Sequence, residues 1–182
     1  DMLNEADLIV LGRRVASFSF DSPDKELWNA LYPPIMTSNQ WALRNSRMNW
    51  FNTTNIYTNT AVEDSALIYA TIEDPNDEVF DDLEVDDSVA WWYGSHNIMD
   101  PEDIGNGTVM ATAANGRPIF VRFDDGDEFY SGSLDYPEGE RVYFGLGCER
   151  DNLYQYYSRY TTLAKEVFLR EAARLSGHVR EV

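Results

Sequence analysis

The chain has 182 residues, 43% of them hydrophobic, and its 32 acidic residues outnumber its 14 basic ones, which gives a formal net charge of −18. This length suits one domain with its own core, while the longest apolar run, residues 8–11, is far shorter than the roughly 20 residues that span a bilayer. We therefore expect no membrane contact, and the negative field also argues against direct nucleic-acid binding unless the few arginines converge. The sequence shows no signal peptide, and its single cysteine, Cys148, excludes an internal disulfide and a Cys-rich zinc site.

The large negative net charge indicates a high-salt environment. It is well beyond the roughly 2 to 8 units that keep a small domain soluble, and at about 1 M salt, where the Debye length is roughly 3 Å, most of the repulsion disappears. Only Lys25 and Lys165 are lysines, against twelve arginines, a balance that resembles proteins of salt-accumulating organisms. We therefore predict a virion or the host cytoplasm of a high-salt organism. Two alternatives are codon bias, for the lysine deficit, and an acidic DNA-mimic inhibitor, for the carboxylates.

The first 52 residues are expected to form the helical part of the domain. An apolar stripe at helical spacing opens the chain, and it consists of Leu8, Leu11, Val15 and Phe18. Ser22 as an N-cap, with Pro23 at the first helical position, predicts a short helix to about Leu31. Ser38 is the N-cap candidate of a third helix, and the polar stretch that follows it, 52–64, is predicted to be an extended loop or an edge strand.

Residues 65–146 are expected to form an antiparallel sheet. The predicted strands cover 66–72, 88–93, 108–113, 117–123, 128–131 and 141–146. Asn115-Gly116 and Asp125-Gly126 are dipeptides of tight hairpin turns, so residues 108–132 are predicted to form a three-stranded antiparallel meander. The acidic segment 73–87 is interpreted as a solvated loop.

A long amphipathic helix is predicted over 151–176, capped by Asp151 and ended by Gly177, because apolar residues recur there at steps of three and four. Helices, then an antiparallel sheet, then a closing helix indicate an α+β fold. We expect residues 1–182 to form one such domain.

The acidic turn at 124–128 is the best candidate for a metal site, since hard cations bind clustered carboxylates. Its acidic residues are Asp124, Asp125, Asp127 and Glu128. Their spacing differs from that of an EF-hand loop, and a charged hairpin tip explains the same residues. We therefore predict neither a metal nor another cofactor.

Catalytic residues are scarce. His96 has Ser95 beside it and Asp100 nearby, but neighbours in sequence are poorly placed to converge as a triad. Cys148 ends a predicted strand, where a nucleophile could be presented, yet the adjacent Glu149 disfavours its thiolate. We predict no catalytic residue; a small hydrolase that uses His96 or Cys148 is an alternative.

The aromatic residues are the candidate interaction site. Alternation along a strand is expected to send Trp91 and Tyr93 to one face of the sheet and Trp92 to the other, so that one large ring lies away from the main packing face. Tyr154 and Tyr157 of the closing helix are further candidates. Exposed Trp and Tyr rings dock onto other chains or stack on sugars, although helices on both faces would bury all three strand rings.

These observations favour a non-catalytic structural protein of a larger multi-subunit complex, with other protein subunits as partners in a homo-oligomer and a hetero-assembly. The Asn/Thr- and Tyr-rich texture is similar to that of virion structural proteins. A head–tail connector, tail or capsid-accessory protein of a virus with a halophilic host is therefore the first interpretation. An extracellular glycan- or protein-binding module that uses exposed Trp and Tyr rings is the competing one.

Overall fold

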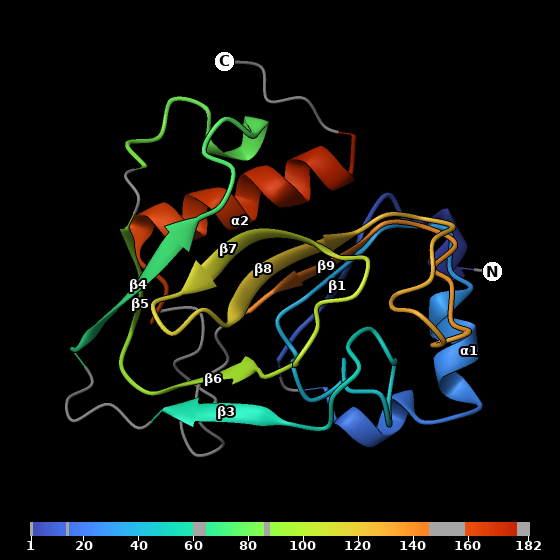
Figure 1. Cartoon of the computed structure of the whole chain (residues 1–182). Helices are drawn as coiled ribbons and strands as arrows, with labels where there is room; N and C mark the ends of the chain where they lie inside the picture. Colours follow the sequence, from blue (N-terminus) through green and yellow to red (C-terminus); the bar gives the residue numbers. More distant parts are fainter. Residues whose placement is uncertain (1, 14, 60–64, 86–87, 146–158, 178–182) are drawn as a thin grey trace.

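The computed structural model describes residues 2–13, 15–59, 65–85, 88–145 and 159–177. Its centre is a curled, seven-stranded mixed sheet with the strand order β1-β2-β9-β8-β7-β4-β5 (Figure 1). These strands are β1 (Ile9–Leu11), β2 (Ile35–Thr37), β9 (Arg141–Phe144), β8 (Pro118–Phe123), β7 (Thr108–Ala113), β4 (Leu67–Ile72) and β5 (Val89–Tyr93). The first three run parallel to one another, and every other pairing is antiparallel.

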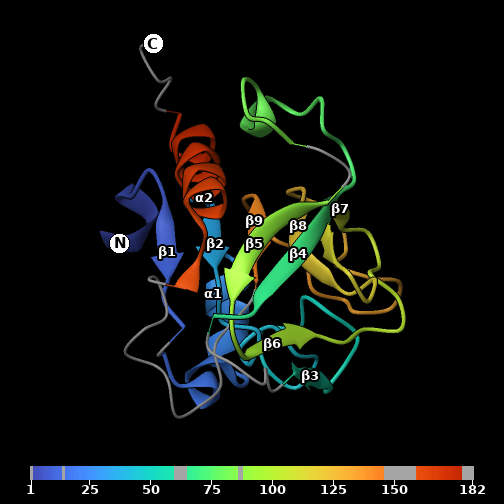
Figure 2. The ribbon, with the colours of Figure 1, turned by 90° about the vertical axis from the view of Figure 1, so that its left-hand side faces the viewer.

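Smaller elements surround this sheet. A second, antiparallel sheet pairs β3 (Ile56–Asn59) with β6 (His96–Met99). The helical elements of the described residues are α1 (Asp24–Asn29), α2 (Thr162–Leu175) and the 3-10 turns η1 (Met2–Glu5), η2 (Ser17–Phe20) and η3 (Glu78–Phe80). Helix α2 lies on one side of the large sheet, and the β3–β6 sheet and α1 lie on the other (Figures 1 and 2). The fold is therefore mostly β.

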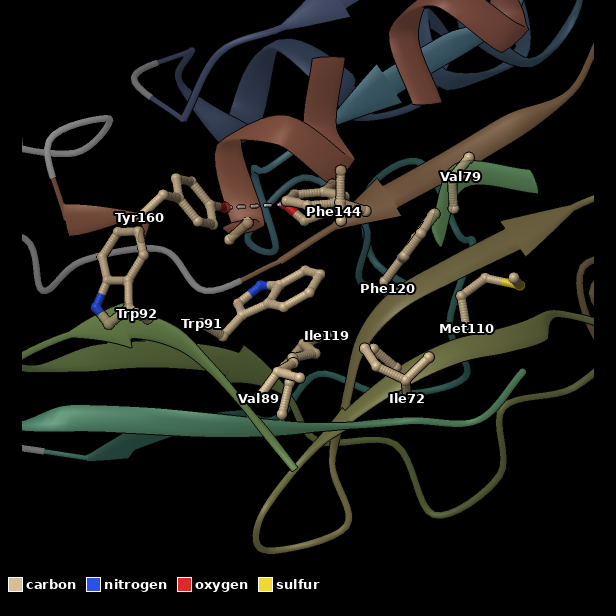
Figure 3. Close-up of a cluster of buried hydrophobic side chains, with 14 of the residues drawn as sticks. Ile72, Val79, Val89, Trp91, Trp92, Met110, Ile119, Phe120, Phe144 and Tyr160 are labelled. Atoms are coloured by element: carbon tan, nitrogen blue, oxygen red, sulfur yellow. Dashed lines mark hydrogen bonds between the residues drawn. The ribbon is translucent and has the colours of Figure 1, made fainter. Parts of the chain in front are cut away.

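Each face of the large sheet has its own buried cluster. Under α2, Phe144 contacts Trp91 and Phe120 with ring-centroid distances of 5.4 and 5.2 Å (Figure 3). It also contacts Phe168 of α2 at 5.3 Å. On the other face, Trp50 and Phe51 of the N-terminal part pack against sheet and loop rings. Aromatic pairs at these distances add about 0.5–1.5 kcal/mol each beyond the burial of their area.

The predicted helical N-terminal part is wrong, and with it the α+β fold class. Residues 9–11 form strand β1, which pairs in parallel with β2, and β2 pairs in parallel with β9. The run Leu8-Ile9-Val10-Leu11 is short and apolar, and periodicity alone does not distinguish a buried strand from a helix in such a run. Only the predicted helix after Ser22 forms, as α1, with Pro23 in the N-cap position.

The helix predicted from Ser38 is also absent, and residues 38–51 form irregular turns instead. Asn49 has a left-handed φ of 64°, and the backbone N–H groups of Trp50 and Phe51 both donate to the carbonyl of Leu43. Asn residues tolerate this conformation and hydrogen-bond to nearby backbone, which favours turns over a helix.

The closing helix is shorter than predicted. It begins after Thr161, whose Oγ1 accepts a hydrogen bond from Ala164 N–H, and Gly177 follows its end with a φ of 68°, as expected. The predicted start at Asp151 lies outside the described residues. The backbone N–H of Thr161 donates to Trp91, and Tyr160 forms a β-bridge with Trp92, so this segment covers the outer edge of β5.

Most of the predicted strands are confirmed. The hairpin of β7 and β8 turns at Asn115-Gly116, where Gly116 has a φ of 77°. The third strand of the predicted meander, 128–131, is wrong, because β8 pairs on its other side with β9. Residues 124–137 form a loop in which the Glu128 carboxylate accepts hydrogen bonds from Gly132, Leu134 and Tyr136.

An ion-pair network attaches α2 to the sheet. Arg122 of β8 donates to Asp77, before η3, and to Glu171 of α2, with N–O distances of 2.6–3.0 Å. Glu171 is fully buried, and Arg174 joins it to Glu140. Burial alone lowers the pKa of Arg122, but its hydrogen bonds to Glu171 and Asp77 outweigh that effect and raise it. Arg122 therefore remains a cation at neutral pH.

A second buried cation, Arg141, forms no salt bridge with the residues that the structure describes. The Arg141 guanidinium, at the start of β9, is fully buried and donates to backbone carbonyls at the end of α1 and in the following turn. These acceptors are Trp28, Asn29, Leu31 and Pro33, and two further acceptors, Gly139 and Glu140, directly precede Arg141 in the chain. Burial lowers the pKa of Arg141 to about 10, so the group remains a cation at neutral pH.

Candidate functional site

The predicted exposure of one tryptophan ring is wrong. Trp91 and Trp92 are both fully buried and belong to the same cluster under α2 (Figure 3). The reason lies in the pairing of β4 with β5, where Ile68 opposes Trp92 and Tyr69 opposes Ala90, so that Trp91 has no direct partner. Such a β-bulge interrupts the alternation of side chains, so both rings face the core. A sugar platform built on Trp92 is therefore excluded.

Tyr93 does reach the surface. It lies directly opposite Leu67 of β4, and the next outward residue of that strand is Tyr69. All three are exposed, with 38–44% of each side chain accessible. This small apolar patch at the edge of the sheet keeps Tyr93 as a candidate contact residue. Tyr154 and Tyr157 lie outside the described residues, so their role stays a prediction.

The histidine does not form a catalytic set. His96 is buried at the start of β6, where burial lowers its pKa, and its Nδ1 lies 3.3 Å from the carbonyl oxygen of Gly94. Asp100 follows the opposite end of β6, about 13 Å along the strand at 3.3 Å per residue, and it accepts a 2.7 Å hydrogen bond from Arg117. Ser95, His96 and Asp100 therefore do not converge as a triad. Cys148 lies outside the described residues.

The acidic turn does not assemble a metal site. Asp124, Asp125 and Asp127 are exposed, while the Glu128 carboxylate organises its own loop through the hydrogen bonds given above. Within the described ranges, no three His, Cys, Asp or Glu side chains are grouped so that they could hold a metal ion. These residues instead form a charged turn at the start of the loop that joins β8 to β9.

The structure brings together a set of residues that the sequence did not reveal. The Cζ atoms of Arg44 and Arg13 lie 5.2 Å and 6.0 Å from the ring centroid of Trp41. Arg44 also donates to the backbone carbonyl of Trp41, and the backbone N–H of Arg47 donates to Arg44. We call Arg13, Trp41, Arg44 and Arg47 the arginine–tryptophan cluster.

Local folding explains why these side chains point outward. Leu43 and Met48 are buried on the inner side of the 38–51 turns and hold them against the sheet. Trp41, Arg44 and Arg47 follow one another at steps of three residues, and all three are partly exposed. Arg13 approaches from the segment after β1. That segment is fixed by a 2.7 Å hydrogen bond from Asn39 Nδ2 to the carbonyl of Val15.

The arginine–tryptophan cluster adjoins exposed apolar side chains. Val15 is 39% exposed and Phe18 is 71% exposed. The carbonyl of Phe18 accepts a hydrogen bond from Asp21, whose carboxylate pairs with Arg47 at 2.7 Å. Arg44 makes no salt bridge with any carboxylate of the described residues. Burial and the nearby charge of Arg47 lower its pKa, and Asp21 partly offsets them. The surface therefore offers an incompletely compensated guanidinium next to apolar area.

The part of the sequence that contains this cluster differs sharply in charge from the rest of the chain. Residues 1–62 carry five basic and six acidic side chains, a net charge of −1, whereas residues 63–182 carry nine and 26, a net charge of −17. No acidic residue occurs between positions 27 and 62. This segregation is a sequence signal that points to the cluster. Arginine forks bind carboxylates bidentately, so the cluster is chemically suited to an acidic protein surface.

Comparisons with known proteins address the fold alone. No protein-family model matches the sequence, and no curated protein is significantly similar to it. The cytoplasmic protein STM3548 from Salmonella typhimurium has a similar structure, with a TM-score of 0.54 and 16% sequence identity over 94% of this chain and 72% of that one. Separately, no helix in the described part of the chain is both long and apolar enough to cross a bilayer.

Proposed function

We propose that this protein is a non-catalytic subunit of a larger protein assembly and that it docks through the arginine–tryptophan cluster. The observation that carries the proposal is the convergence of Arg13 and Arg44 on Trp41, beside the exposed Phe18, within the nearly neutral third of a chain of net charge −18. Trp and Arg dominate the binding energy of protein interfaces, and apolar area beside them excludes water from the contact.

The more specific proposal, that the assembly is a virion, rests on the amino-acid composition. A virion component of a virus with a halophilic host, such as a connector, tail or capsid-accessory subunit, agrees with the acidic surface and with the Asn/Thr- and Tyr-rich texture. A glycan-binding module loses its main support because Trp92 is buried. The Tyr93 patch then serves as a second contact surface of the same assembly.

Photo-crosslinking tests the docking surface. With p-benzoylphenylalanine in place of Phe18, irradiation of the protein in its native source is expected to give a discrete protein–protein adduct, because this side chain is exposed beside the cluster. The matched control places the same group at Leu134, which is 78% exposed but lies outside the cluster. We expect a yield on the order of tenfold higher at position 18. Equal yields at both positions, or adducts with nucleic acid alone, would contradict the proposal.

The dependence of the melting temperature on salt concentration tests the prediction that the protein comes from a high-salt environment. Between 0.1 M and 1 M KCl the Debye length falls from about 10 Å to about 3 Å, which screens the repulsion among the surplus carboxylates. A relief of about 2 kcal/mol corresponds to a rise in melting temperature of about 4–8 °C for a protein of this size. Calorimetry in KCl and in NaCl measures the rise, and equal effects of the two salts identify screening. A melting temperature that does not change with salt would remove the high-salt assignment.

A further inference from the structure

We infer that the occupant of the arginine–tryptophan cluster is the acidic segment 73–85 of a second copy of this chain, so that copies join head to tail. The inference rests on the proposed function, because it names the partner of that same docking surface. It uses the strongest charge contrast in the molecule, between the nearly neutral residues 1–62 and the acidic remainder.

The acidic segment is built to present carboxylates. Val79 and Phe80 are buried, and Asp77 is fixed by Arg122 and by the backbone N–H of Val79, so the segment is anchored from within. Its other acidic residues are exposed, and no salt bridge occupies them among the residues that the structure describes. These are Glu73, Asp74, Glu78, Asp81, Asp82 and Glu84. Arg122 holds Asp77, and Arg170 donates to the backbone carbonyl of Asp81. The segment is thus an anchored anionic surface whose exposed carboxylates form no salt bridge within the described residues.

The two surfaces lie at opposite ends of the molecule. In Figures 1 and 2, η2 and the turns of residues 38–51 are at the lower end, and η3 of the acidic segment is at the upper end. They therefore meet only between copies. A contact between two different surfaces of identical chains is heterologous, and it closes into a ring or extends as a filament, depending on the rotation between copies.

Salt acts on this contact in two ways. At low salt the net charge of −18 on each copy opposes association over a long range. At about 1 M salt that repulsion is screened to roughly 3 Å, while bidentate Arg–carboxylate bonds at contact distance and the burial of Phe18 remain. We therefore expect oligomers in about 1–3 M KCl and monomers in dilute buffer.

Two complementary variants test the arrangement by sedimentation velocity in high KCl. Arg44→Gln disables the cluster, and Glu78→Gln/Asp81→Asn/Glu84→Gln disables the segment, and neither change creates a new complementary charge. Each variant alone is expected to be monomeric, with an association constant at least about tenfold below that of the wild type. An equimolar mixture of the two retains one intact cluster and one intact segment, so it is expected to form dimers and nothing larger.

Matched controls change the charge equally at other sites. Arg117→Gln mirrors the first variant, and Asp124→Asn/Asp125→Asn/Asp127→Asn mirrors the second. Both are expected to assemble like the wild type. Circular dichroism melts confirm that every variant is folded.

Several outcomes overturn the inference. The inference is wrong if the wild-type chain stays monomeric from 0.1 to about 3 M KCl. It is also wrong if the mixture of the two variants fails to dimerise. A third contrary result is that the cluster binds a single-stranded DNA oligonucleotide while the chain does not self-associate. If Phe18 crosslinks to a different protein subunit, the head-to-tail partner is wrong and the proposed function stands. If Phe18 crosslinks to no protein, both fail.

Discussion

Replacement of Arg122 by methionine is expected to lower the free energy of unfolding by about 3–5 kcal/mol. Arg122 is the only cation that contacts Asp77 in the described structure, and it shares the fully buried Glu171 with Arg174. Methionine preserves much of the apolar stem but leaves two poorly compensated carboxylates beneath α2. Urea unfolding measures the loss.

The matched control is Arg117→Met, since the Arg117–Asp100 pair is more exposed and such pairs contribute at most about 1 kcal/mol.

The dependence of the free energy of unfolding on acidic pH provides a second test of the Arg122 network. Burial raises the pKa of Asp77, but hydrogen bonds from Arg122 and Val79 outweigh it and hold the pKa below its ordinary value. The stability that Asp77 provides is therefore present above its unfolded pKa and is lost as the pH falls through the folded one. The difference between wild type and variant should shrink below about pH 4; a loss under about 1 kcal/mol at neutral pH would show that the network is dispensable.

Replacement of Arg141 by methionine is expected to destabilise the protein by about 4 kcal/mol or more, because it leaves several buried carbonyls without a donor and each such group costs about 1–3 kcal/mol. The shortest contacts are those of Nη2 to Leu31 and Nη1 to Gly139, at 2.7 and 2.8 Å. Arg141 thus holds the end of α1 against the start of β9.

Arg141→Lys separates charge from geometry. Lysine keeps a cation but has three donors on one nitrogen instead of five in a planar fork. We therefore expect an intermediate loss in urea unfolding, with the methionine variant less stable than the lysine variant. If the two variants were equally unstable, the positive charge alone would contribute nothing, and the planar fork would account for the whole effect.

The features that could be predicted from the sequence are local. The β7–β8 hairpin depends on Asn115-Gly116, whose backbone preference acts over four residues, and the helix end at Gly177 depends on one left-handed residue. Strand β1 depends instead on a chain of pairings, because it joins the sheet through β2, and Ile35 of β2 pairs with Arg141. No local pattern contains that information.

The candidate site shows the same division. The bulge at Trp91 follows from the pairing of β4 with β5, so the alternation argument could not anticipate that Trp91 and Trp92 share a face. The scarcity of carboxylates in residues 1–62 is visible in the sequence, but the meeting of Arg13 with Arg44 on one ring requires two distant segments to be folded together. The sequence therefore predicts that the charges are segregated, but it does not predict that Arg13 and Arg44 converge on Trp41.

The position of β9 between β2 and β8 has a consequence for biosynthesis. A ribosome makes β2 roughly 100 residues before β9, which at about 5–20 residues per second is an interval of roughly 5–20 s. Throughout that time β2 lacks its neighbour β9, so the β1–β2 pair has nothing that joins it to the rest of the sheet. We therefore expect nascent chains of this protein to be more prone to aggregation before β9 has been synthesised than after it.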